Sequence, residues 1–171
     1  DSISLSITDP STQGSASHKI LDAWIYIDDQ SVGAFELPCT VPVLYEGSHE
    51  IKIRAGIKEN GIAETRIFYP FYEIVKQTVT LTRGQITTLN PTTAYSQAAD
   101  FTWMEDFSSA SLSVCDTVNS DTVMKQTTVA SDVFEGTGSG VVALGSGTIG
   151  YVGVSCNKYV LPKDGSSVFL E

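Results

Sequence analysis

The chain has 171 residues, which is enough for one large β domain or two small ones. Its formal net charge is −10 at pH 7, and its ten Lys and Arg residues form no cluster along the sequence, which argues against a nucleic acid partner. No apolar run reaches the length of a transmembrane helix. The abrupt opening at Asp1 is what we expect of a mature chain whose leader has been removed.

Period-two patterns predict strands from the start of the chain. Residues 1–7 place Ile3 and Leu5 on one face and serines on the other, as in a half-buried strand, and residues 9–19 then predict a loop. Gly, Ser, Thr and Val are abundant, and no sustained 3.6-residue period occurs. We therefore expect an all-β protein with less than about a tenth of its residues in helix.

The segment 23–54 predicts the organisation of the first half. Trp24–Ile27 is β-branched and aromatic, Asp28–Ser31 is a polar turn, and Val32–Leu37 resumes an extended pattern, so the three together predict a hairpin. After a second turn at 46–48, side chains alternate again, with Ile51 and Ile53 predicted in a core. The opposite face, expected in water, carries Glu50, Lys52 and Arg54.

This order of strand, acidic turn, Val-Gly step, proline step and Gly-Ser-His turn resembles the PEGA-type repeat. The matching positions are Ile25–Asp29, Val32–Gly33, Pro38 or Pro42, and Gly47–His49. Asp29 stands where the family usually has glycine, and the Pro-Glu-Gly-Ala tetrapeptide itself is absent. The resemblance implies a small immunoglobulin-like β-sandwich that binds or spaces partners at cell surfaces, with no enzyme activity.

Aromatic residues crowd the stretch RIFYPFY at 66–72. Such rings either close the core of a sandwich or form an exposed binding platform, and core packing is the favoured interpretation. The candidate ligand-binding residues are Tyr69 and Tyr72, with Trp103 from the second part of the chain. We expect Phe71 to be buried and at most one or two tyrosines to be exposed, which favours a protein partner over a glycan.

Turn signals divide the chain. Strands predicted over 73–82 and 86–90 close a first domain at 1–91, and the small polar residues 92–99 predict a linker. Short apolar runs bounded by Gly, Ser, Asn or Asp continue through 100–171, as in a sandwich or jelly roll.

The second part resembles the opening half of jelly-roll domains of the carbohydrate-binding and lectin type, from Glu105–Phe107 through 133–144 to 167–171. Its final run has no closing turn, so we expect this domain to continue beyond Glu171. The two domain types together resemble surface lipoproteins of Bacteroidota-type bacteria. That resemblance implies an extracytoplasmic, outer-membrane or cell-surface location through a lipid-anchored cysteine outside this sequence.

No catalytic constellation is found. Glu105 and Asp106 are adjacent, so on a strand they point to opposite faces and do not form a glycosidase pair. His18 and His49 lie in or beside turns with no nucleophile motif nearby. We therefore expect no enzyme activity, no catalytic residue and no cofactor, while the acids between 100 and 121 leave a metal ion undecided because the calcium-loop spacing is absent.

The three cysteines lack zinc-site spacing, and their odd number leaves at least one thiol unpaired. Cys115 and Cys156 would pair only if their strands are neighbours, which spacing does not decide. We interpret the chain as a non-enzymatic extracytoplasmic binding or scaffolding protein, either an accessory subunit of an outer-membrane assembly or an adhesion protein, with a protein partner at the cell envelope. The alternative is a carbohydrate-binding protein of a glycan-utilisation system, with a surface glycan as its partner.

Overall fold

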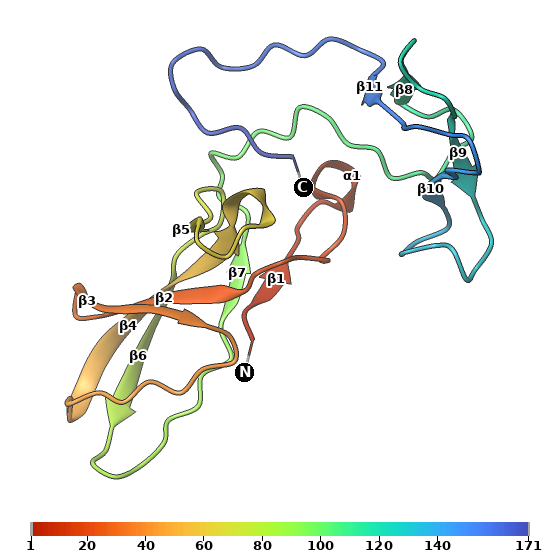
Figure 1. The fold of residues 1–171 in the computed structure, drawn as a ribbon. Coiled ribbons are helices and arrows are strands. Elements are labelled where there is room, and N and C mark those ends of the chain that lie inside the picture. Colours follow the sequence, from red (N-terminus) through yellow and green to blue (C-terminus); the bar gives the residue numbers. More distant parts are fainter. Residues whose placement is uncertain (1, 171) are drawn as a thin grey trace. The chain divides into compact units, whose positions relative to one another are not determined.

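A computed structural model describes residues 2–170 (Figure 1). Strands hold 34% of the residues and helices 4%, so the all-β prediction and the low helix content are confirmed. The chain divides into two compact units, Asp1–Asp100 and Phe101–Glu171, and each unit is described by itself. The helices are single turns, α1 at Pro10–Gln13 and a 3-10 turn at Glu59–Gly61.

The first unit is organised by a five-stranded antiparallel sheet in the order β3-β2-β4-β5, with β6 also paired to β4. Its strands are β2 (Asp22–Ile27), β3 (Gln30–Glu36), β4 (Gly47–Lys58), β5 (Arg66–Phe68) and β6 (Val75–Leu81). The long β4 pairs with β2 on one side. On its other side it pairs first with β6 and then with β5.

Two acidic residues form the turn of the β2–β3 hairpin. Asp28 and Asp29 have φ angles of 48° and 66°, in the left-handed region that two-residue hairpin turns require. Aspartate tolerates this region better than most residues, and glycine tolerates it best. The backbone at Asp29 therefore explains why a glycine would also suit this position.

A hydrophobic core covers one side of the sheet. Strand β1 (Ser4–Ser6) pairs in parallel with β7 (Thr92–Ala94) (Figure 1). Ile3, next to β1 in the sequence, is only 1% exposed. Ile51 and Ile53 are 7% and 6% exposed, so the predicted alternation of β4 is confirmed. The buried core residues are Ile3, Ile20, Ala23, Ile27, Ile51, Ile53, Ala55 and Val79.

Two expectations near the end of the first unit need correction. The interval 92–99, expected as a linker, belongs to the fold: it contains β7, and the Thr93 hydroxyl donates a hydrogen bond of 2.8 Å to the Glu73 carbonyl. The interval 86–90 forms no strand. The small polar residues of 92–99 gave no periodic signal. Strand β7 forms because these residues pair with the distant β1, and no apolar pattern accompanies that pairing.

The second unit consists of two short antiparallel pairs, β8 (Val114–Asp116) with β11 (Gly153–Ser155) and β9 (Met124–Thr127) with β10 (Ser139–Val142). A disulfide joins Cys115 to Cys156, whose Cα atoms lie 5.0 Å apart, and Cys39 is a free thiol. Every buried apolar side chain among residues 2–170 belongs to the first unit. Backbone pairing, side-chain hydrogen bonds and the disulfide thus hold the second unit, and a jelly-roll topology stays a prediction.

Candidate binding face

The side of the five-stranded sheet that points away from the core gathers aromatic and cationic side chains. Directly opposed residues of antiparallel strands share a face. The register sets Trp24 opposite Arg54, Tyr26 opposite Lys52, and Lys52 opposite Lys76. We define the outer face by eight residues on this side: Trp24, Tyr26, Lys52, Arg54, Lys58, Arg66, Phe68 and Lys76.

Two perpendicular rings and an arginine form the centre of the outer face. The centroids of Trp24 and Phe68 lie 5.9 Å apart with their planes at 85°, and the Arg54 guanidinium carbon lies 4.1 Å from the Phe68 centroid. A Cβ atom at Gly56 would lie 2.9 Å from the Asp22 Cβ and 3.0 Å from the Trp24 indole nitrogen. Glycine at position 56 therefore allows the indole to pack directly against β4.

A buried carboxylate lies beneath this centre. Asp22 is 1% exposed and forms an ion pair with Arg66, which also reaches the Glu36 carboxylate at 2.9 Å. The hydrogen bond from Arg66 to Glu36 holds the pKa of Glu36 below its usual value. Among the described residues, Asp22 Oδ2 and Trp24 Nε1 are buried without a hydrogen-bond partner, an unfavourable state for an acceptor and a donor that both flank Gly56.

The fold concentrates positive charge that the sequence disperses. Five of the ten Lys and Arg residues project from the outer face: Lys52, Arg54, Lys58, Arg66 and Lys76. Lys52 and Arg66 each pair with two carboxylates, whereas Arg54 and Lys76 pair with none in the part of the chain that the structure describes. Lys52, Arg54 and Lys58 share one face of β4, and strand register brings Arg66 and Lys76 beside them.

Lys52 and Arg54 lie on the predicted side of β4, but full exposure in water was wrong. The Lys52 side chain is 19% exposed because it lies between Asp29 and Glu50, with its Nζ 3.2 Å from a Glu50 carboxylate oxygen. Hydrogen bonds to these two carboxylates raise the pKa of Lys52. The positive charge of Lys52 is therefore paired with carboxylates of the first unit.

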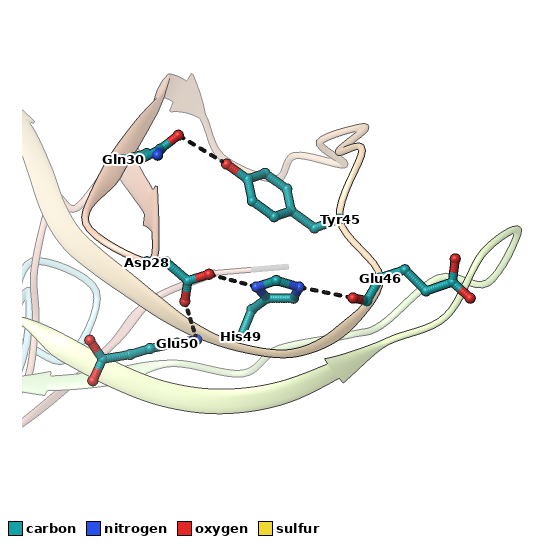
Figure 2. A network of polar contacts seen from close by, with 6 residues as sticks. All are labelled: Asp28, Gln30, Tyr45, Glu46, His49 and Glu50. Carbon is teal, nitrogen blue, oxygen red and sulfur yellow. Dashed lines mark hydrogen bonds and ion pairs between the residues drawn. The ribbon is translucent and has the colours of Figure 1, made fainter.

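A network of polar contacts at one end of the sheet ties the β2–β3 turn to the start of β4 (Figure 2). His49 Nδ1 lies 2.6 Å from Asp28 Oδ2, and His49 Nε2 lies 3.1 Å from the Glu46 carbonyl oxygen. The other Asp28 oxygen accepts a 3.0 Å bond from the Glu50 backbone N–H, and the Tyr45 ring meets His49 edge-on at 5.1 Å. Both imidazole nitrogens face acceptors, so the protonated ring, with two donors, satisfies both.

These contacts make the network depend on pH. The hydrogen bond to Asp28 raises the pKa of His49 above its ordinary 6.5, and the bond from His49 holds the pKa of Asp28 below its ordinary 3.8. The contribution of His49 to the stability of the folded state is fully present below pH 6.5, and it is lost as pH rises through the raised pKa of His49. The Asp28 contribution is complete above pH 3.8 and is lost on acidification through the lowered pKa, so the network stabilises most between these two values.

Two of the predicted aromatic candidates, Tyr69 and Tyr72, pack on each other. Tyr69 is 6% exposed and meets the half-buried Tyr72 at 4.6 Å, and Tyr72 in turn meets Tyr95 at 5.2 Å. Phe71, expected to be buried, is half-buried and touches Tyr69 edge-on. These rings pack on one another at the end of the first unit, whereas Trp103 belongs to the second unit.

Trp103 and Glu105 are held by hydrogen bonds within the second unit. The Trp103 indole N–H donates to the Ser113 hydroxyl at 2.8 Å, and its ring lies 6.2 Å from that of Tyr159. Glu105 accepts from the Ser113 backbone N–H at 2.5 Å and from the Phe107 N–H at 2.8 Å. Partial burial alone would raise the pKa of Glu105, but these hydrogen bonds outweigh it and lower the pKa. Glu105 therefore holds the loop together.

Residues 2–170 contain no group of three or more His, Cys, Asp or Glu side chains placed to hold a metal ion. In the same residues, no helix combines the length and the apolar character needed to cross a bilayer. No protein-family model, no curated protein and no solved structure matches the chain. Function is therefore inferred from the chain's own residues.

The outer face was not predicted as a site from the sequence. Trp24 lies in a predicted strand and Arg54 was assigned to the water-facing side, so alternation across the two strands was the available signal. Phe68 joins them only through the pairing of β5 with β4, which sets Phe68 opposite Gly56. That pairing leaves no mark in local sequence.

Proposed function

We propose that the chain is a non-enzymatic binding or scaffolding protein of the cell surface and that it contacts a protein partner through the outer face. The observation that carries this proposal is the meeting of Trp24, Arg54 and Phe68 on a sheet face. Trp, Tyr and Arg dominate the energetic centres of protein interfaces, because they offer large contact areas and directional hydrogen bonds. All three central side chains keep part of their surface in solvent.

Ring geometry favours a protein partner over a glycan. Sugar rings stack on open aromatic faces, but Trp24 and Phe68 are perpendicular and Arg54 covers one face of Phe68. Tyr69, one of the original candidates, is buried. Perpendicular rings flanked by a guanidinium instead fit between the side chains of another protein surface.

The location belongs to the same proposal. Disulfides persist in oxidising compartments, so the Cys115–Cys156 bond supports an extracytoplasmic site. The resemblance of the β2–β4 segment to PEGA-type repeats supports attachment at the outer membrane or cell surface, through a lipid anchor outside this sequence. A role as an accessory subunit of a surface assembly or in adhesion is part of the same proposal, and the outer face supports it.

Photo-crosslinking on intact cells that express the protein tests this proposal. Benzoylphenylalanine replaces Phe68 on the outer face or, as a matched control, Ile86, which is 82% exposed on a loop of the same unit. We expect a discrete protein adduct from position 68 that is absent from position 86 and is lost on Arg54→Ala. Adducts from position 86 alone, or none from either position, would overturn the proposal. Binding on a glycan array that Trp24→Ala abolishes would establish the carbohydrate alternative.

A further inference from the structure

We propose that the partner presents an acidic segment to the outer face, so that carboxylates of another protein contact Arg54 and Lys76. This inference rests on the proposed function and adds the chemistry of the partner. It follows from the placement of charge on a chain whose net charge is −10: half of all Lys and Arg residues project from one side of a single sheet, and although four carboxylates pair with Lys52 and Arg66 there, none in the described chain pairs with Arg54 or Lys76.

Of these cations, Arg54 is the one best placed to bind a carboxylate of the partner. Its guanidinium lies over the Phe68 ring, which limits its motion, and it has no carboxylate partner in the described chain. No hydrogen bond from Arg54 to a carboxylate of the described residues accompanies this contact, so its guanidinium N–H groups can donate to a partner's carboxylate. The guanidinium fork matches a carboxylate with two parallel hydrogen bonds.

Lys76 supplies a second, independent observation. It lies directly opposite Lys52 across the β4–β6 pair, an arrangement of like charges that destabilises a sheet. Asp29 and Glu50 neutralise Lys52, but no carboxylate in residues 2–170 pairs with Lys76. A partner carboxylate would give Lys76 the kind of ion pair that Lys52 already has.

The spacing of the cations favours an extended polypeptide. Lys76 lies opposite Lys52, two positions before Arg54, so Arg54 and Lys76 are diagonal neighbours across the β4–β6 pair, about 7 to 8 Å apart. An extended segment with Asp or Glu at alternate positions places its carboxylates at a similar spacing of about 6.8 Å. The perpendicular rings beside Arg54 disfavour the alternative of an acidic polysaccharide, which would stack its sugar rings.

Poly-L-glutamate at low ionic strength is the probe, and the two tryptophans provide the readout. Each unit has one indole N–H, Trp24 on the outer face and Trp103 bonded to Ser113, so a proton–nitrogen correlation spectrum of the full chain should show two indole signals. We expect titration to shift the Trp24 signal and to leave the Trp103 signal in place. Added salt should reverse the shift, because the contacts are ionic.

Variants define the site. Arg54→Ala and Lys76→Ala should each weaken binding about tenfold, as the loss of a charge-assisted contact predicts, with well-dispersed spectra showing intact folding. Lys163→Ala removes the same charge from an exposed site in the second unit and should leave affinity unchanged.

An unmoved Trp24 signal, equal shifts of both indoles, or affinity unchanged by Arg54→Ala would overturn the inference. Binding to polygalacturonate but not to poly-L-glutamate would overturn it in favour of an acidic glycan. If poly-L-glutamate does not bind but position 68 still crosslinks to a protein, the proposed function stands and the partner has another chemistry. Failure of both experiments rejects the outer face as a contact surface.

Discussion

Substitution of Ile53 tests how the core is divided from the outer face. Ile53 is 6% exposed and lies opposite Ile25 on one neighbouring strand and Val75 on the other. Ile53→Ala removes three carbon atoms from this site, which at about 0.8 kcal/mol per buried carbon is a transfer loss of about 2.4 kcal/mol. A residual cavity between Ile25 and Val75 adds to that loss, so unfolding should become easier by about 2 to 5 kcal/mol.

Denaturant unfolding followed by tryptophan fluorescence measures this change. A Trp103→Phe background leaves Trp24 as the single reporter, and Trp24 lies in the same sheet as Ile53. Ile86→Ala is the matched control, because the same atoms are removed from a side chain that is 82% exposed, and its effect should be within about 0.5 kcal/mol.

If Ile53→Ala fails to fold, Ile53→Val should still lower the unfolding free energy by about 0.5 to 1.5 kcal/mol. Equal effects at positions 53 and 86 would refute the assignment of β4 faces. Since a register slip of one residue exchanges the two faces of a strand, that result would also remove Arg54 from the outer face.

Three further changes test other parts of the structure. Gly56→Ala should lower the unfolding free energy by about 1 to 3 kcal/mol in the same assay, because its Cβ meets Asp22 and the Trp24 indole, whereas Gly150→Ala, with open space around it, should not. His49→Gln should lower the unfolding midpoint more at pH 6, below the ordinary pKa of 6.5, than at alkaline pH above the raised pKa of His49; equal losses would contradict the charged network. Replacing Cys115 and Cys156 by serine should destabilise the second unit by about 4 kcal/mol, the loop-closure value for a separation of 41 residues, read from Trp103 fluorescence; an unchanged midpoint would contradict it.

Local pattern predicted much of the first unit. The alternation at 49–54 placed Ile51 and Ile53 in the core, and the β2–β3 hairpin followed from an apolar run ending in two aspartates. These features depend on neighbours in sequence, where period and turn chemistry act directly.

Long-range pairing accounts for what the sequence did not predict. Strand β7 forms because Thr92–Ala94 meets β1, about ninety positions earlier, and nothing in its small polar residues signals a strand. The disulfide likewise depends on the pairing of β8 with β11. The outer face has the same origin, since Arg54, Phe68 and Lys76 become neighbours of Trp24 or Lys52 through register alone.

Carbene footprinting of the protein in place on intact cells, compared with the purified chain, tests the claim of a binding face most directly. Labelling of Trp24 and Phe68 should fall on cells, while Ile86 and Leu44, both highly exposed in the first unit, keep the labelling of the purified protein. Equal labelling of Trp24 and Phe68 in the two samples would contradict the claim.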